Sequence, residues 1–399
     1  MTKTVLISGA GIAGPTLAYW LKAGGFEPTL IEKAPALRSG GYVIDFWGHG
    51  YDLAERMELL PDIERAGYRI KELRIVNDDG DKVAGFGTSV FRELTGGRYV
   101  TLPRSELSRL LFEKAARSSE VIFGSEIESL HQDEAGVSVQ LSRGGKRRFD
   151  LVIGADGLHS AVRSLVFGPQ DRFEKHLGYV VAALEVGGYR PRNDDVYLMY
   201  NQPERMLGRV SLRGDRALFL FVFACKPDSL PATRDGQKAL IRERYADEKW
   251  ECPAILAALD RAEDIYCDRV SQIRMPHWSQ GRVALIGDAA FCVSLLAGQG
   301  SALAMISAYV LAGELVRSGG AHPEAFAEYE ALTRSFIESK QQAAERFAGA
   351  FAPRTGWGLM FRNLVLNLTA IPGLARWAIG RDLIDRLVLP AYPWDARRR

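Results

Sequence analysis

Three glycines near the start of the chain have the spacing of a phosphate-binding turn. Gly9, Gly11 and Gly14 separate a short apolar run at residues 5–7 from a segment with helical apolar spacing at residues 15–23. In such a strand, turn and helix, the first glycine permits the turn, the second lets backbone approach a pyrophosphate, and the third allows close packing. The helix N-terminus would then face the phosphates. The pattern predicts a dinucleotide-binding site, with a plain glycine turn as the alternative.

An acid completes this pattern. A second apolar strand at residues 28–31 ends on Glu32, which is followed by Lys33. A carboxylate at the end of that strand can accept both hydrogens of an adenosine ribose diol. Glu32 is therefore predicted to bind the adenosine side of the dinucleotide.

Two further acids follow buried strands later in the chain. Asp156 lies in Gly154-Ala-Asp-Gly157 after an apolar strand at residues 148–153, and a helix capped near Ser160 is expected next. Asp288 follows Gly287 at the end of another apolar strand. Ligands of open α/β sheets bind at the carboxyl ends of the strands. Both acids are therefore candidates for a ligand site.

Three other segments suggest contacts with an anionic or flat ligand. Gly298-Gln-Gly300 begins an apolar helix, whose first N–H groups would face something negative. Arg104 sits in the first turn of a helix, where an acid is the ordinary choice, so it indicates an anionic partner or a surface ion pair. Gly40 and Gly41 lie in a Gly-rich loop that either admits a ligand or is an ordinary surface loop.

The elements that carry these motifs predict a mixed α/β fold. Residues 1–71, 101–177 and 276–350 are expected to form a Rossmann-type dinucleotide-binding domain. Residues 72–100 and 178–275 are patterned mainly as strands and predict an interleaved antiparallel-sheet domain that covers the ligand. Residues 351–399 predict a C-terminal helical region that docks against the body.

Composition excludes several other classes of protein. Lys plus Arg number 51 and Asp plus Glu 49, so a net charge of +2 gives no case for nucleic acid. The four cysteines form no CxxC pair or zinc spacing, which indicates reduced thiols, no metal and a cytoplasmic protein. The longest uninterrupted apolar run, residues 217–225, is too short for a membrane span, and the chain leads directly into a strand, so no signal peptide is expected.

The order of these motifs resembles the class A flavoprotein monooxygenases, the group of para-hydroxybenzoate hydroxylase. The resemblance rests on the first glycine turn, on Gly154-Ala-Asp-Gly157, and on Gly287-Asp-Ala-Ala290 with Gly298-Gln-Gly300. It covers residues 4 to 315, and within the group the chain looks most like the tetracycline-inactivating monooxygenases and relatives acting on polyketides. It implies bound FAD. It also implies NADPH or NADH as a transient reductant, because the chain has only one dinucleotide fingerprint.

By this resemblance Arg104 approaches the ribityl and phosphate part of FAD, and Asp288 binds the ribityl or pyrophosphate side. Asp156 serves both the FAD and the pyridine nucleotide, and residues 298–300 face the isoalloxazine. The full set of residues expected at the cofactor is Gly9, Gly11, Ile12, Ala13, Gly14, Glu32, Lys33, Arg38, Gly40, Gly41, Arg104, Asp156, Gly287, Asp288, Gly298, Gln299, Gly300 and Ala302.

The implied reaction is hydroxylation of an aromatic, phenolic or polyketide-like small molecule. Dioxygen would add at the flavin C4a, and the hydroperoxide would deliver oxygen to an electron-rich carbon. No side chain need act as a nucleophile. We expect a monomer or weak homodimer. The candidate substrate contacts, each of which also has an ordinary structural interpretation, are Asp45, His49, Arg213, Phe221 and Phe223.

The chain departs from the family pattern at three positions. Phe291 stands where the family usually has His, Leu295 where it has a Pro close to the flavin, and Ala302 where an Asn is common. The change at Leu295 keeps a second hypothesis open, a flavin reductase or dehydrogenase that inserts no oxygen. A third hypothesis is a flavin-containing protein that sequesters an aromatic drug without turnover.

Overall fold

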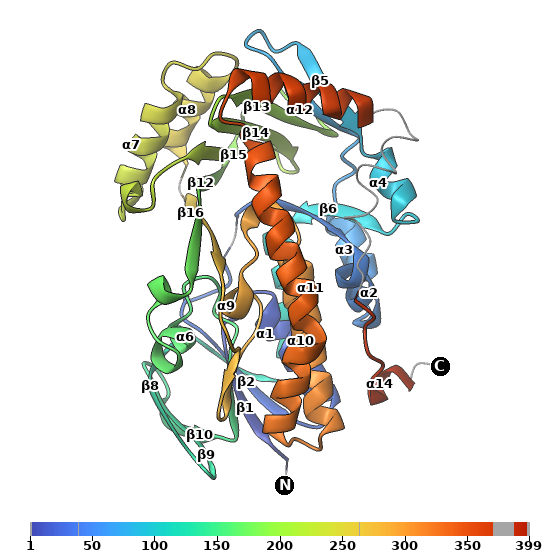
Figure 1. The fold of residues 1–399 in the computed structure, drawn as a ribbon, viewed down its shortest axis with the longest axis vertical. Coiled ribbons are helices and arrows are strands. Elements are labelled where there is room, and N and C mark those ends of the chain that lie inside the picture. Colours follow the sequence, from blue (N-terminus) through green and yellow to red (C-terminus); the bar gives the residue numbers. More distant parts are fainter. Residues whose placement is uncertain (1, 39, 263, 370–386, 397–399) are drawn as a thin grey trace.

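The computed structural model describes residues 2–38, 40–262, 264–369 and 387–396. Two sheets dominate the molecule: a six-stranded sheet occupies the lower part of Figure 1 and a seven-stranded sheet the upper part. This mixed α/β architecture confirms the predicted fold class. The predicted domain bounds stay a prediction, and β12 of the upper sheet begins at Glu174, before the expected bound at residue 178.

The six-stranded sheet is parallel apart from its edge strand β17. Its central strands read as continuous apolar runs because they are buried on both faces, and Val5, Leu6 and Ile7 have no exposed surface. Helices α1, α5 and α10 and a three-stranded sheet share its core. In sheet order the strands are β17 (Ser279–Gln280), β18 (Val283–Leu285), β11 (Leu151–Gly154), β1 (Thr4–Ser8), β2 (Glu27–Glu32) and β7 (Glu120–Phe123).

The elements around this sheet complete the parallel-sheet part of the molecule. They are α1 (Ala13–Ala23), α5 (Arg104–Ala116), α6 (Ala161–Val166), α9 (Asp288–Phe291), α10 (Gly300–Arg317), the 3₁₀ helices η1 (Gln170–Arg172) and η3 (Leu295–Ala297), and the strands β8 (Ile127–Asp133), β9 (Gly136–Leu141) and β10 (Gly145–Phe149). By length and composition α10 could cross a membrane, but 72% of it is buried inside the protein, as expected of a core helix.

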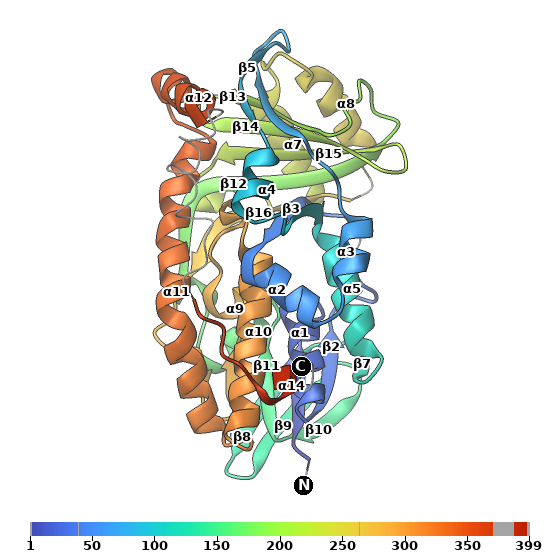
Figure 2. The ribbon, with the colours of Figure 1, turned by 90° about the vertical axis from the view of Figure 1, so that its right-hand side faces the viewer.

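The seven-stranded sheet is antiparallel except where β13 pairs with β4 in parallel. In sheet order the strands are β16 (Tyr266–Ile273), β12 (Glu174–Gly187), β15 (Arg216–Ala224), β14 (Arg205–Leu212), β13 (Val196–Gln202), β4 (Glu72–Val76) and β5 (Lys82–Gly87). Helices α7 (Arg234–Tyr245) and α8 (Cys252–Arg261) cover one face, and η2 (Pro227–Ser229) precedes them. The other face looks toward the parallel-sheet part (Figure 2).

A two-stranded ribbon lies between the sheets. It pairs β3 (Val43–Trp47) with β6 (Tyr99–Pro103), so the expected Gly-rich loop contains a strand. Side chains alternate along a strand, and Ile44 and Phe46 point into the core of the parallel-sheet part. Val43, Asp45 and Trp47 therefore face the other way. Nearby helices are α2 (Gly48–Arg56), α3 (Leu60–Ala66) and α4 (Ser89–Leu94).

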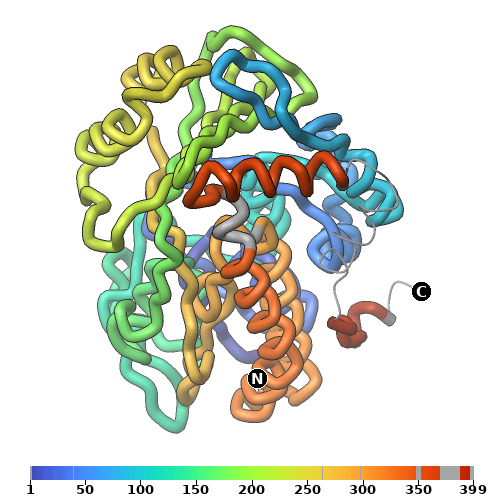
Figure 3. The backbone as a smooth tube through the Cα atoms, turned by 45° about the horizontal axis from the view of Figure 1, so that its top comes forward, coloured from blue at the N-terminus to red at the C-terminus, as the bar shows by residue number. Residues whose placement is uncertain are grey.

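The C-terminal segments connect the two parts. Helix α11 (His322–Phe351) runs alongside both, and α12 (Gly356–Thr369) crosses over the upper sheet and packs on β5 (Figure 3). Helix α14 (Pro393–Ala396) returns to the parallel-sheet part, where the Trp394 and Trp20 rings lie 5.2 Å apart. This docking agrees with the expectation for the end of the chain, although Arg397–Arg399 lie outside the described residues.

Candidate cofactor and substrate site

The first glycine turn has the geometry that its sequence predicts. Gly9 has φ +109°, and a Cβ there would lie 2.4 Å from the carbonyl oxygen of Ala155, while a Cβ on Gly14 would lie 1.9 Å from the carbonyl oxygen of Gly9. A Cβ on Gly11, in contrast, would have nothing within 4 Å. The first and third glycines thus allow close packing, and the second faces open space that a ligand can fill.

The helix that follows is open at its N-terminus. Helix α1 begins at Ala13, and neither a side-chain cap at Ile12 nor an acid in the first turn satisfies its first N–H groups. Such an end offers hydrogen bonds and a positive dipole to phosphate. Glu32 lies beside this turn, where its Oε2 accepts a hydrogen bond from the Ala10 N–H at 3.0 Å and its Oε1 one from Ala34 at 2.9 Å.

The three motifs meet at one edge of the parallel sheet. Strands β18, β11, β1 and β2 are neighbours in that order, so their carboxyl ends lie side by side. A Cβ on Gly287 would come within 3.2 Å of Ala13 at the start of α1, which places the Gly287–Asp288 turn next to the first glycine turn. Residues as far apart in the chain as Ala13 and Gly287 therefore form a single site.

Asp156 sits at this edge but already has partners. Its carboxylate accepts hydrogen bonds from the Ser160 hydroxyl at 2.5 Å and from the Val162 N–H at 3.1 Å. Burial raises the pKa of Asp156, while these hydrogen bonds oppose the rise. Its carboxylate therefore holds the start of α6, and the expected cap at Ser160 is confirmed by its hydrogen bond from the Arg163 N–H.

A buried charged cluster surrounds Arg104 at the start of α5. Tyr42 accepts a backbone hydrogen bond from the Arg104 N–H at 3.0 Å. Burial alone would lower the pKa of Arg104, but nearby Tyr42, Asp288 and Tyr266 raise it. For Asp288 burial raises the pKa, and Arg104 and a hydrogen bond with Cys292 oppose the rise. Arg104 is thus a cation in a protein environment rather than half of an exposed ion pair.

The glycines around α10 leave room beside this cluster. A Cβ on Gly298 would meet nothing within 4 Å, and one on Gly300 would lie 3.9 Å from the Asp288 carboxylate. No side chain caps α10 at Gln299, and its first turn has no acid. The start of α10 therefore offers N–H groups toward the same space. Ala302 packs at Gly50 of α2.

The loop that carries Gly40 and Gly41 approaches the seven-stranded sheet. A Cβ on Gly40 would lie 4.0 Å from the Glu185 carboxylate of β12, and one on Gly41 would meet nothing. Lys33 and Arg38 are exposed nearby.

The features of the whole site fit a dinucleotide such as FAD. Open glycines and uncapped helix ends suit the pyrophosphate, and Arg104 with Asp288 suits the polar chain. Within the described ranges no cluster of His, Cys, Asp or Glu could hold a metal ion.

Polar side chains from the cofactor edge and from the upper sheet face one another beside Arg104 and outline a recess. We call it the interface recess and define it by side chains that keep some accessible surface although burial is the largest influence on the pKa of each. They are Tyr42, Asp45, Arg104, Tyr197, Tyr266 and Asp288. Asp45 is exposed and the other five side chains are half-buried, so the recess is open to solvent at Asp45. The Tyr42 and Tyr266 rings, 6.0 Å apart, join its two walls.

Asp45 is the only one of the five predicted substrate contacts that lies in the interface recess. His49 is instead held in α2, where Nδ1 lies 3.1 Å from Asp52 and Nε2 lies 2.6 Å from the carbonyl oxygen of Leu387. Its ring therefore anchors the returning C-terminal segment. We leave His49 out of the substrate site.

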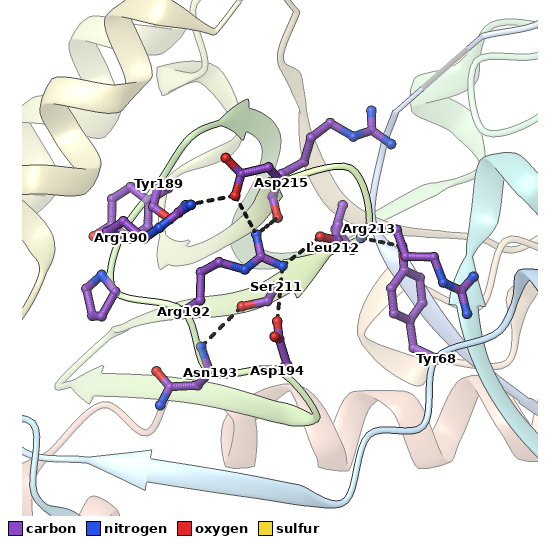
Figure 4. A network of polar contacts seen from close by, with 12 residues as sticks. Tyr68, Tyr189, Arg190, Arg192, Asn193, Asp194, Ser211, Leu212, Arg213 and Asp215 are labelled. Carbon is purple, nitrogen blue, oxygen red and sulfur yellow. Dashed lines mark hydrogen bonds and ion pairs between the residues drawn. The ribbon is translucent and has the colours of Figure 1, made fainter.

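Arg213 lies at an outer turn of the upper sheet. Its guanidinium donates to the carbonyl oxygens of Arg65 and Ala66 at the end of α3 and covers the Tyr68 ring at 4.7 Å. Figure 4 shows it pointing away from the cluster around Arg192 and Asp215. A cation at a helix C-terminus is favourable for structural reasons. Arg213 is therefore also left out of the substrate site.

Phe221 and Phe223 lie on the other face of the upper sheet. Both are buried with Phe219 beneath α7 and α8, and the Phe221 and Tyr245 rings are 5.1 Å apart. On β15 it is Leu218, Leu220 and Val222 that face the parallel-sheet part. Strand alternation had indicated burial without indicating which face was covered by helices.

Sequence reasoning gave Arg163 no role. Its side chain has no exposed surface and donates to the carbonyl oxygens of Ala289 at 2.9 Å and Leu158 at 2.6 Å. It thereby ties the turn after Asp156 to the turn after Asp288. An arginine seven residues beyond Asp156 was visible in the sequence, but only the fold shows that it joins two motifs.

Comparison with known proteins agrees with this geometry. A family model described as an FAD-binding domain matches residues 2–344. The chain belongs to this FAD-binding family. An uncharacterised protein of Mycobacterium tuberculosis is 38% identical over 85% of this chain and 92% of its own length. A flavin-dependent monooxygenase from an unknown prokaryotic organism is 34% identical over 85% and 88%.

A solved structure, the tetracycline destructase Tet(55), matches 98% of this FAD-binding family member and 99% of its own chain, with 30% identity and a TM-score of 0.83. Together these comparisons confirm the predicted family, the bound FAD and the assignment as a flavin-dependent monooxygenase. The individual cofactor contacts named above stay predictions.

Proposed function

We propose that this monooxygenase uses NADPH or NADH to reduce FAD and hydroxylates a phenolic or enolic, polycyclic small molecule of the polyketide type. The observation that carries the proposal is the interface recess, which borders the Arg104–Asp288 cluster on one side and aromatic and apolar side chains of the upper sheet on the other. The similarity to a tetracycline destructase supports a polycyclic substrate.

The chain positions the reactants and excludes water. FAD, when bound, supplies the activation of dioxygen and the transfer of one oxygen atom. Arg104 and the start of α10 would hold its anionic and polar groups, because both present positive charge to a desolvated space. Tyr42 and Tyr266, with Leu220 of β15, would cover the reacting region from the sheet side. Water that bound ligands expel from the recess would no longer weaken these electrostatic contacts.

The test is to purify the protein, record its visible spectrum, and follow NADPH and NADH oxidation with phenols, anthracyclines and tetracyclines while products are analysed by mass. We expect released FAD and one class of ligand that both speeds reductant loss and gains one oxygen atom. Ligand binding without ligand-stimulated oxidation would instead favour a sequestering protein. A colourless protein that FAD cannot reconstitute would refute the proposal.

A flavin reductase or dehydrogenase is the second candidate, and Leu295 is the observation in its favour. Leu295 begins η3 and packs toward the upper sheet, where the resemblance implies a proline close to the flavin. The preceding Ser294 has φ +101°, so the backbone is strained at this point. Peroxide formation without an oxygenated product in the same assay would support this candidate.

We also propose a cytoplasmic protein that is a monomer or weak homodimer and uses dioxygen as its second substrate. Light scattering over a range of concentrations tests the oligomeric state, and oxygen uptake that matches reductant consumption tests the use of dioxygen.

A further inference from the structure

Asp45 is a carboxylate without a counter-charge in the interface recess. The Tyr99 and Thr101 hydroxyls both donate to its Oδ1, each at 2.6 Å, and Oδ2 accepts no hydrogen bond from the described residues. No Lys, Arg or His of the described part pairs with it, although most acids of the chain that are not at the site have such partners. The two hydroxyls hold the carboxylate in place and leave one oxygen available.

The direction of Asp45 follows from the ribbon register. Asp45 stands opposite Thr101, Trp47 stands opposite Tyr99, and all four share the face away from the core residues Ile44 and Phe46. Tyr197 of β13 is close enough for the Asp45 charge to raise the pKa of Tyr197. The carboxylate therefore lies between the ribbon and the upper sheet.

Aromatic rings lie next to Tyr99, one of the two residues that hold this carboxylate. The Tyr99 ring stacks on Phe91 with centroids 5.9 Å apart, and the Trp47 ring lies 6.4 Å from Tyr99. A carboxylate beside aromatic rings suits an organic cation, which pairs with the charge and contacts the ring faces. An anionic group would instead be repelled by the like charge of the carboxylate.

The ribbon also sets the distance between Asp45 and Arg104, the residue at the cofactor side of the recess. Tyr42, whose carbonyl oxygen meets the Arg104 N–H, precedes Asp45 by three residues. At a rise of about 3.3 Å per residue, Asp45 lies about 10 Å along the ribbon from that end. A polycyclic molecule spans such a distance, with the reacting ring at one end and another substituent at Asp45.

We infer that Asp45 is a specificity residue that binds a protonated amino substituent of the substrate. The inference rests on the proposed function, since it assigns a substrate class to the same recess. It predicts that amino-bearing ligands are preferred to their neutral analogues, and that ligands with a carboxylate at that end are excluded.

The test is an equilibrium titration of the oxidised, FAD-loaded protein without reductant, so that binding is measured apart from turnover. Three probe pairs differ in the amine: tetracycline and its 4-de(dimethylamino) analogue, daunorubicin and its aglycone, and tyramine and 4-ethylphenol. Each is followed by the change in flavin absorbance or by calorimetry. We expect the amine of at least one pair to bind about ten-fold or more tightly than its neutral partner, as for a charge-assisted contact.

The variant Asp45→Asn should abolish this preference, because the amide keeps the shape and the acceptor for Tyr99 and Thr101 but has no charge. Asp79→Asn, in the exposed turn between β4 and β5, is the matched control and should keep the preference. If the Asn variant did not fold, Asp45→Ser would serve, since it also removes the charge and should likewise abolish the amine preference.

The inference is overturned if no amine binds more tightly than its neutral partner, including the case in which no probe binds. It is also overturned if Asp45→Asn keeps the preference. These results differ from failure of the proposed function. Oxygenated products from neutral phenols alone would refute the amine site only, whereas an amine preference without any oxygenated product would refute the monooxygenase function only.

Discussion

The two faces of the seven-stranded sheet have different roles. Beneath α7 and α8, Phe219, Phe221 and Phe223 are fully buried, and the Tyr245 hydroxyl donates to the carbonyl oxygens of Met206 and Val222. The opposite face carries partly accessible tyrosines over a recess that holds a carboxylate with no cationic partner among the described residues. One face is packed as a core, where the Tyr245 hydroxyl has hydrogen-bond partners. The other keeps polar groups available for ligands, which costs folding free energy.

The pKa shifts of carboxyl groups also differ between the recess side and the upper sheet. Burial raises the pKa of Asp45, Asp156 and Asp288 at the cofactor and recess side, whereas hydrogen bonds from Arg74 and Lys82 lower the pKa of Glu72 on the upper sheet. A raised carboxyl pKa means that ionisation opposes folding, and a lowered pKa means that it favours folding. Perturbed acids of the first kind gather where function is expected.

The largest predicted effect is on the helix-covered face. Phe221→Ala should lower the free energy of unfolding by about 3–5 kcal/mol, because it leaves a cavity beside Tyr245 that the sheet and two helices cannot close. Urea unfolding of the FAD-loaded protein measures this. The matched variant Leu220→Ala, on the recess face of the same strand, should destabilise less, since Leu220 is only partly buried. An equal loss for both would contradict the comparison.

The next effect concerns the cofactor edge of the recess. Arg104→Ala should weaken FAD binding about 10- to 100-fold, as expected when a charge-assisted contact worth about 1.5–3 kcal/mol is lost. Titration of apoprotein by quenching of FAD fluorescence gives the affinity. Arg109→Ala is the control in the same helix, because Arg109 forms exposed ion pairs with Glu106 and Glu113. Unchanged FAD affinity in Arg104→Ala would remove Arg104 from the cofactor site.

Local rules made much of the cofactor side predictable. The turn at Gly9, the helix start at Arg104 and the cap at Ser160 each depend on neighbouring residues, so the sequence alone contains the information. The parallel sheet then brings the strand ends together by a general rule of α/β folds. This is why motifs far apart in the chain could be assigned to one ligand before the fold was known.

Long-range packing set the limits of prediction. Alternation along β15 indicates that Phe221 is buried, but the helices that cover it come later in the chain, so its face could not be assigned. Strand β3 was hidden in a Gly-rich loop because its partner β6 lies some 55 residues away. Arg213 was a candidate substrate contact because the carbonyl oxygens that it meets belong to another segment of the chain. In each case the missing partner, rather than the residue, was unknown.

The smallest predicted effect sharpens the comparison at Asp45. The pKa of Asp45 is higher in the folded than in the unfolded state, so between these two pKa values the folded state binds more protons. The contribution of Asp45 to the free energy of unfolding therefore falls as the pH rises through this window. Above the window the contribution is constant. Asp45→Asn should therefore leave the ligand-free protein at pH 7 equally stable or slightly more stable, by about 0.5 kcal/mol or less, because solvent in the recess screens the charge.

Thermal unfolding at pH 7 and well below pH 3.8, the ordinary pKa of an aspartate, tests this, with Asp79→Asn alongside. The small gain should vanish at the lower pH, where Asp45 is protonated in both states. In the same pH series the amine preference of the wild-type protein should decline as pH falls through the raised pKa of Asp45, with Tyr99, Thr101 and Tyr197 uncharged throughout. A marked loss of stability in Asp45→Asn at pH 7 would show that the carboxylate is a structural partner, and the recess face would then be packed by the same rule as the face beneath α7 and α8.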